Sequence, residues 1–288
     1  MSNSRILPEF ELLAPTSIAE AVEMASEYKD GAAVLAGGTD LMIMLQKSLR
    51  PQHVIALGEI PDLDYITYSK NDGLRIGALV TAWQLVQDSK VKKNYTALWQ
   101  AASSLGSPQI RNAATIVGNI LRASPSGDCC CAMLALGGSV VLESVSGKRE
   151  VPIDEFFIDY GKINRKADEI AVGLHIPAPA EGAVSAFMRM TRMNFDLAKV
   201  SAAVRLDMKG KKCGSARVAM GAVAPTTVRI KKAEDILGNT TISQKTLDDV
   251  AAAVPRQLKP IDDVRSTADY RRQVSGILVK RTLQAACA

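Results

Sequence analysis

Several residue types that define common functional sites are scarce in this sequence. It has two histidines, His53 and His175, and neither belongs to an HExxH pattern or has a nucleophile context. The chain of 288 residues has five cysteines, three of them consecutive, which do not make a disulfide framework. Aromatic residues make up 5% of the chain and do not interleave with its lysine pairs. These shortages argue against metal or nucleophilic catalysis through histidine, a disulfide scaffold and a nucleic-acid surface.

Long apolar segments are also missing. No apolar run approaches the ~18 residues that a membrane span requires, so we expect no membrane span. Residues 1–5 carry a positive charge but no long apolar core follows them, and we expect no signal peptide there. With cysteines that do not pair, these features predict a cytoplasmic protein with reduced thiols. The net charge of +5, spread along the chain, is interpreted as solvated surface charge, with no nucleic-acid partner.

The composition of the sequence is typical of a globular protein, and its apolar residues follow strand and helix patterns. A chain of this length with 47% hydrophobic residues has room for one large or two ordinary domains. The short segment 10–13 and the apolar runs at 33–36 and 54–57 are typical of strands. Helices are expected between them, one of them starting at a capping box formed by Ser17 and Glu20. This alternation over residues 1–57 predicts a small α/β lobe with parallel strand pairing.

From residue 58 onward the pattern changes. An Asn71-Asp72-Gly73 turn between two alternating segments predicts a β-hairpin, and Thr81 with Gln84 predicts a second capping box. The later segments predict a lobe with a mixed or antiparallel sheet over residues 58–177. The proline-containing segment 177–182 is the expected domain boundary. Residues 183–288 then predict a smaller C-terminal α/β domain with a three-stranded sheet and helices.

The first candidate site is a glycine turn after the second apolar run. Its residues are Val34, Leu35, Ala36, Gly37, Gly38, Thr39, Asp40 and Leu41. Glycine has no Cβ, so its backbone N–H groups can approach an anion closely, and a helix start adds a favourable dipole. Thr39 can donate its hydroxyl to phosphate, whereas Asp40 would repel phosphate and is expected to cap the helix. Taken alone, such a turn is most often a tight connection, and it is not the Gly-x-Gly-x-x-Gly turn of a Rossmann domain.

A second glycine turn strengthens the case for an anion site. The turn Thr115-Ile116-Val117-Gly118-Asn119 follows a polar loop that contains Gly106 and the run Ile110-Arg111-Asn112. A proline-containing segment comes next and ends in an acid, Asp128. Two such turns that face each other can grip a diphosphate from both sides.

These linked motifs resemble the FAD-binding, or medium, subunits of the molybdenum hydroxylase family, which includes xanthine, carbon monoxide and nicotinate dehydrogenases. The family pattern is an IRN segment, a TIGGN-like turn and an ASPxxD-like segment in this order, and the likeness extends over nearly the whole chain. Val117 departs from it, since the family usually has a glycine there. The resemblance implies an α+β fold. Residues 1–177 would form a two-lobed, PCMH-like FAD-binding domain and residues 183–288 the C-terminal domain.

The resemblance also implies a set of cofactor-binding residues and no catalytic or metal-binding residue. Residues 34–41 would wrap the diphosphate, and Gly106 with residues 115–119 would complete the cradle. Asp128 would accept a hydrogen bond from the flavin or its ribityl chain, although a helix N-cap is an equal interpretation of this acid. Ile170 and Met188 would contact the isoalloxazine, where the family often has lysine in place of Met188. Leu197 lies in a stretch, 194–198, that matches a loop beside the flavin.

The consecutive cysteines Cys129, Cys130 and Cys131 suggest an iron–sulfur cluster at first sight. Consecutive side chains on a helix point about 100° apart, so three such thiols cannot easily converge on one cluster. The other two, Cys213 and Cys287, are isolated in the sequence. We therefore interpret the three cysteines as small, buried helix residues.

The function implied by the resemblance is electron transfer within a larger enzyme. FAD in this chain would pass electrons from the [2Fe–2S] clusters of a small subunit to an acceptor such as NAD, a quinone or ferredoxin. A large subunit would hold molybdopterin, where the substrate is hydroxylated. Two alternatives stay open: a stand-alone FAD-dependent oxidoreductase of the same flavin fold, and a non-catalytic assembly subunit.

Overall fold

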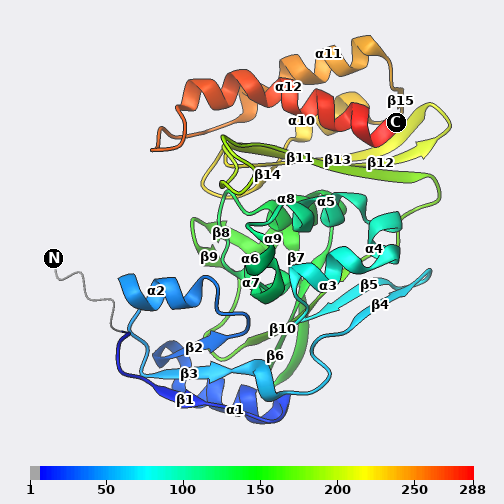
Figure 1. Ribbon diagram of the computed structural model, residues 1–288. Helices are drawn as coiled ribbons and strands as arrows, with labels where there is room; N and C mark the ends of the chain where they lie inside the picture. The colour runs from blue at the N-terminus through cyan, green and yellow to red at the C-terminus, as the bar shows by residue number, and fades with distance from the viewer. Residues whose placement is uncertain (1–6) are drawn as a thin grey trace.

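The computed structural model describes residues 7–288, which form three layers stacked from bottom to top in Figure 1. A small lobe lies at the bottom, a second lobe in the middle and the C-terminal domain at the top. Each layer has its own cluster of buried apolar side chains. Residues 1–6 lie outside the described residues, and with them the segment at which we expected no signal peptide. Within residues 7–288, no helix has both the length and the apolar character to cross a membrane.

The small lobe contains the parallel sheet that the strand and helix pattern predicted. Its elements are β1 (Glu11–Leu13), α1 (Ile18–Tyr28), η1 (Lys29–Gly31), β2 (Ala32–Leu35), α2 (Leu41–Lys47), β3 (His53–Ala56) and η2 (Leu57–Glu59). The strands lie in the order β1-β3-β2, and both pairings are parallel. Ser17 caps α1 as predicted, but Glu20 accepts the backbone N–H of Thr16 and not that of Ser17. The carboxyl end of β2 therefore delivers the first glycine turn to the boundary with the middle lobe.

The middle lobe has an antiparallel sheet in the order β4-β5-β10-β6-β7. Its strands are β4 (Ile66–Ser69), β5 (Gly73–Gly77), β6 (Ser139–Ser144), β7 (Gly147–Pro152) and β10 (Ile170–Ile176), with a small hairpin of β8 (Phe157–Asp159) and β9 (Lys162–Ile163). Its helices are α3 (Ala82–Gln87), α4 (Ser89–Asn94), α5 (Thr96–Ser104), α6 (Pro108–Ala113), α7 (Ile116–Leu121), α8 (Asp128–Leu136) and α9 (Ile153–Phe156). The predicted capping box of Thr81 and Gln84 is present at α3.

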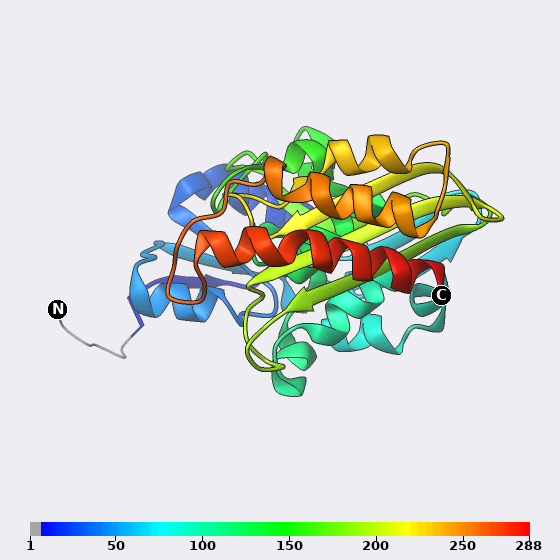
Figure 2. The same ribbon diagram turned by 90° about the horizontal axis from the view of Figure 1, so that it is seen from above.

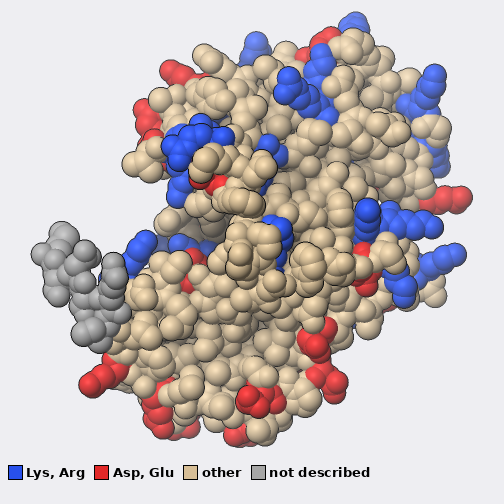
Figure 3. Space-filling model, viewed as in Figure 1, with Lys and Arg blue, Asp and Glu red and all other residues tan. Residues whose placement is uncertain are grey.

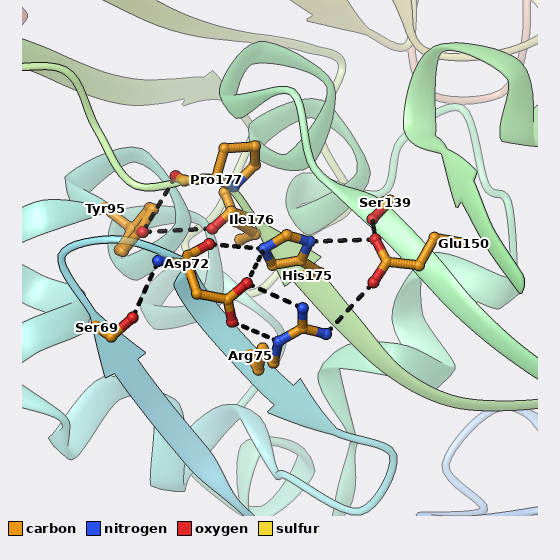
Figure 4. Close-up of polar contacts among 9 residues, drawn as sticks. All are labelled: Ser69, Asp72, Arg75, Tyr95, Ser139, Glu150, His175, Ile176 and Pro177. Carbon is orange, nitrogen blue, oxygen red and sulfur yellow. Dashed lines mark hydrogen bonds and ion pairs between the residues drawn. The ribbon is translucent and has the colours of Figure 1, made fainter. Parts of the chain in front are cut away.

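His175 joins the two hairpins on either side of β10 (Figure 4). Its Nδ1 lies 3.1 Å from Glu150 Oε2 on β7, and its Nε2 lies 2.7 Å from the carbonyl oxygen of Asp72 in the β4–β5 turn. Burial acts to raise the pKa of Glu150, but the hydrogen bonds from Ser139, His175 and Arg75 outweigh it and lower that pKa. These contacts give His175 a structural role, since they link the two hairpins across β10.

The C-terminal domain is a sheet with helices on its outer face. Its elements are β11 (Ala183–Met190), β12 (Val200–Lys209), β13 (Lys212–Gly221), β14 (Val228–Arg229), α10 (Lys231–Leu237), β15 (Thr240–Thr241), α11 (Gln244–Ala253), η3 (Val254–Gln257) and α12 (Ala268–Cys287). The predicted three strands are β11, β12 and β13, and the two short strands β14 and β15 extend them. Seen from above, α12 crosses the strands, with α11 alongside it (Figure 2).

Strand alternation divides the C-terminal sheet between two cores. Ala186, Val204 and Met220 face the outer helices, whereas Phe187, Ala203 and Ala219 belong to the core of the middle lobe. Side chains at alternate positions of a strand point to opposite faces, so one sheet closes both layers. Helices α5 and α8 contact its inner face.

Charge is unevenly distributed over the face shown in Figure 3. Acidic side chains gather over the small lobe at the bottom of the view, and basic ones lie mostly above them in separate clusters. A nucleic-acid surface usually presents a continuous basic stripe or patch. The face in this view has no such stripe.

Two arginines of the C-terminal sheet fasten it to the end of α8. Arg205 donates to the carbonyl oxygen of Leu136 at 3.0 Å, and Arg217 donates to that of Leu134 at 2.8 Å. Arg217 also pairs with Asp154 of α9 at 2.5 Å. Positive charge at a helix C-terminus is favourable because the last carbonyl groups carry partial negative charge.

Replacing Arg217 tests this attachment. Arg217→Met should lower the free energy of unfolding by about 1–3 kcal/mol, because it leaves the Leu134 carbonyl without its donor and leaves Asp154 with Arg229 as its remaining partner. The matched control is Arg272→Met, which removes an exposed pair with Asp269 and should cost less than about 1 kcal/mol. Urea unfolding followed by circular dichroism measures both. Equal losses for the two variants would contradict the proposed attachment.

Candidate functional site

The first glycine turn packs directly against the chain that precedes the second. A Cβ placed on Gly37 would lie 1.9 Å from the carbonyl oxygen of Ala113, and Gly38 has a φ of +69°. A side chain on Gly37 would displace backbone, and the positive φ of Gly38 favours glycine over any other residue. Within residues 7–288, the backbone N–H groups of Gly37, Gly38 and Thr39 donate to no other atom of the chain. The turn therefore offers a cluster of free donors in a place without room for a side chain.

The second turn is the start of helix α7. The Thr115 hydroxyl caps this helix by accepting the N–H of Gly118 at 3.1 Å, and a Cβ on Gly118 would meet that hydroxyl. Val117, the departure from the family pattern, is 2% exposed and packs in the middle-lobe core. Its helical backbone needs no glycine, so the departure leaves the turn intact. Gly106, in the preceding loop, has a φ of +49°, which a glycine adopts readily.

Asp40 stands at the N-cap position of α2, but its side chain accepts no hydrogen bond from the helix, so the prediction that it caps the helix is wrong. The Asp40 carboxylate instead forms an ion pair with Arg122, which directly follows α7. This pair links the two glycine turns and offsets the negative charge that Asp40 places beside them.

Asp128 is the buried acid of the site and is 6% exposed. It is the first residue of α8 and not its N-cap, so the capping interpretation is wrong. Its Oδ2 accepts from Arg189 Nη1 at 2.7 Å and lies 3.4 Å from the Ser104 hydroxyl. Burial raises the pKa of this carboxyl to about 6, against the attraction of Arg189. Its Oδ1, like Asn119 Oδ1, is buried with no hydrogen-bond partner among the described residues.

The remaining predicted residues lie in different settings. Ile170, the first residue of β10, is 1% exposed and packs in the small-lobe core. Met188 packs against the C-terminal core, on the outer face of the sheet. Leu197 is 51% exposed, in the loop between β11 and β12. Strand β11 turns Arg189 toward Asp128, and sequence reasoning missed this residue. A signal was available, because Arg189 alternates with Met188 and must therefore face the opposite side.

The three consecutive cysteines are buried in α8, as predicted, at 0%, 1% and 0% exposure. Burial raises the pKa of the Cys130 thiol to about 12, which keeps it protonated and unreactive. Among residues 7–288 there is no group of three or more histidine, cysteine or acidic side chains arranged to hold a metal ion.

Comparison with known proteins identifies the class of fold and site. Residues 8–179 match the FAD binding domain in molybdopterin dehydrogenase, and residues 185–286 match the CO dehydrogenase flavoprotein C-terminal domain. The chain is thus a two-domain flavoprotein subunit of the dehydrogenase type. It belongs to the family of FAD-binding subunits of the molybdenum hydroxylases, as the sequence resemblance indicated.

Individual relatives are similar along their whole length. The carbon monoxide dehydrogenase medium chain of Hydrogenophaga pseudoflava is 32% identical over 98% of this chain and 99% of its own. The nicotinate dehydrogenase FAD-subunit of Eubacterium barkeri is 32% identical over 95% of both chains. The structure of the Hydrogenophaga carbon monoxide dehydrogenase that lacks the Mo-pyranopterin moiety superposes with a TM-score of 0.94 over 98% of both chains.

The residues of this chain fit the FAD that the family binds. The free N–H groups of the first turn can donate to the oxygen atoms of a diphosphate. A side chain at Gly37 would collide with the Ala113 backbone, so the turn needs glycine there. The buried, unpartnered Oδ1 atoms of Asp128 and Asn119 suit the hydrogen-bond donors of a flavin or a ribityl chain.

Replacing Gly37 tests the cradle. Gly37→Ala should weaken FAD binding at least about tenfold, or 1.4 kcal/mol, because the new Cβ forces the turn away from Ala113. Gly58→Ala is the matched control: a Cβ there meets nothing within 4 Å, so affinity should not change. Fluorescence titration of the apoprotein with FAD measures both. Unchanged affinity in the Gly37 variant would make the turn a plain connection.

Proposed function

We propose that this chain is the electron-transfer subunit of a multi-subunit molybdenum hydroxylase. The observation that carries the proposal is the pairing of two glycine turns with a buried, half-satisfied acid in a chain of this family. When bound, FAD supplies the redox chemistry between the [2Fe–2S] clusters of a partner subunit and an external acceptor.

The residues of the chain have separate tasks in this proposal. The backbone of residues 34–41, Gly106 and residues 115–119 holds the diphosphate. Asp128 Oδ1 accepts a hydrogen bond from the flavin ring or the ribityl chain. Leu197, which is exposed, contacts the isoalloxazine, whereas Ile170 is 1% exposed in the small-lobe core and is assigned no such contact. Met188 packs on the opposite face of β11, so we assign the charged position near the ring to Arg189 instead. No residue of the chain acts as a general acid or base.

The partners follow from the relatives. One relative is the medium chain of a carbon monoxide dehydrogenase. A solved structure of that enzyme lacks the Mo-pyranopterin moiety of the molybdenum cofactor, which shows that the enzyme uses such a cofactor. We therefore propose a molybdopterin-binding large subunit and a [2Fe–2S] small subunit as partners. We further propose NAD, a quinone or ferredoxin as the electron acceptor and the cytoplasm as the location of the complex.

The nature of the cofactor provides the first test of this function. The purified chain should be yellow, with the two-band spectrum of a flavin, and should release FAD and not FMN on denaturation. The reason is that paired glycine turns serve a diphosphate, which FMN lacks. Chromatography of the released flavin measures this. Release of FMN alone, or no binding after reconstitution with FAD, would contradict the proposal.

The partner subunits provide the second test. Purified from its native source, the tagged chain should bring with it one subunit that contains molybdenum and one with reducible [2Fe–2S] clusters. Metal analysis and electron paramagnetic resonance of the complex measure both. The isolated chain should not oxidise a heterocyclic or aldehyde substrate. Turnover by the isolated chain would favour the stand-alone oxidoreductase, and a flavin-free chain would favour the assembly subunit.

A further inference from the structure

Arg189 joins three parts of the molecule through one guanidinium group. It extends from β11, its Nη1 lies 2.7 Å from Asp128 of α8, and its Nη2 donates to the carbonyl oxygen of Asn194. The side chain is 11% exposed and that of Asp128 is 6% exposed, so their contact is largely shielded from water, whereas the contact with Asn194 lies at the surface. A planar guanidinium can serve two acceptors in fixed directions, which an ammonium group does less well.

The segment that Arg189 contacts is the loop of residues 191–199. Its apolar side chains Met193, Phe195 and Leu197 are 60%, 65% and 51% exposed, so packing contributes little to holding residues 192–197. Ala198, which is 1% exposed, packs at the end of the loop that leads into β12. The Arg192–Asp196 pair lies within the loop, at 3.4 Å. Among the described residues, the donation from Arg189 to Asn194 is the one hydrogen bond by which residues 191–198 are attached to the rest of the chain. The exposed part of the loop, residues 192–197, therefore depends on Arg189 for its position.

Asp128 stands at the other end of this connection with one oxygen unused. The groups that act on it are Arg189 from β11 and Ser104 from α5, and the titratable groups that follow it on its own helix are the thiols of Cys129, Cys130 and Cys131. The thiols stay neutral because burial raises the pKa of each. Arg189 is therefore the single charge that holds the carboxylate, and Oδ1 remains free.

We propose that Arg189 is a positioning residue that couples the loop of residues 191–199 to the flavin, through the carboxylate of Asp128. The inference rests on the proposed FAD function. A donor of the flavin or ribityl chain that binds Oδ1 favours the ionised carboxylate. The ionised carboxylate holds Arg189, and Arg189 holds Asn194. By thermodynamic reciprocity, a loop fixed in this way also strengthens binding at Asp128.

The coupling has a defined pH dependence. In the apoprotein Asp128 takes up a proton as the pH falls through about 6, because its pKa in the folded chain is raised to that value. The neutral carboxyl attracts Arg189 less, so the loop loosens below that pH. Bound FAD favours the ionised form and should move this transition to lower pH. The affinity for FAD should therefore fall as the pH drops below about 6.

Hydrogen exchange of the loop tests the coupling, with FAD as the probe. In the wild-type chain at pH 7, FAD should raise the protection factors of residues 192–197 about tenfold or more. Asp128→Asn should bind FAD with an affinity that no longer changes near pH 6. Arg189→Lys keeps the positive charge but loses the planar guanidinium that serves two acceptors, so FAD should still bind while most of the loop protection is lost. Arg192→Lys, which changes only the exposed pair within the loop, is the matched control and should behave as wild type.

The possible outcomes separate the two proposals. FAD that binds Arg189→Lys with wild-type loop protection would overturn the coupling and leave the FAD site standing. The same holds if wild-type affinity does not change between pH 7 and pH 5. A wild-type chain that binds no FAD would overturn the proposed function and, with it, this inference. The double variant Asp128→Asn/Arg189→Met removes both charges together, and its loop should stay unprotected with FAD present.

Discussion

Helix α8 is buried along its whole length, and polar contacts at its two ends connect the middle lobe to the C-terminal domain. Its first residue, Asp128, pairs with Arg189, and its last carbonyls accept from Arg205 and Arg217. A buried helix cannot leave its terminal groups to water, so partners must come from the chain. All three arginines lie on strands of the C-terminal sheet. The contacts of Arg205 and Arg217 therefore satisfy carbonyl groups at the end of the helix, and together with the Arg189–Asp128 pair they fasten the C-terminal domain to the middle lobe.

The composition of α8 follows from this position. Cysteine and alanine fill most of the helix, and their small side chains allow the sheet strands β12 and β13 to approach it. The three thiols are therefore packing residues. Asp128 is the charged residue of the helix, and its Oδ1 has no hydrogen-bond partner among the described residues. A polar atom left unpartnered in so enclosed a place is costly to folding, which is why we connect it with a ligand.

Much of the fold could be predicted because its signals are local. The capping box of Thr81 and Gln84, the glycine turns and the alternation of strands and helices each depend on residues close together in sequence. The roles of Asp40 and Asp128 could not be predicted in the same way. Both acids begin short helices and look like caps. Their partners, Arg122 and Arg189, are distant in sequence, and only folding brings them near.

The sequence by itself determined the class of the protein, because its motifs fall in a fixed order and short-range chemistry decides what each forms. Tertiary structure alone decided which side chains meet. A shift of one residue along a strand reverses the face of the sheet, and so Met188 packs in one core while Arg189 reaches Asp128 on the other side. Burial and electrostatic pairing act between residues far apart in the chain, and no local pattern records them.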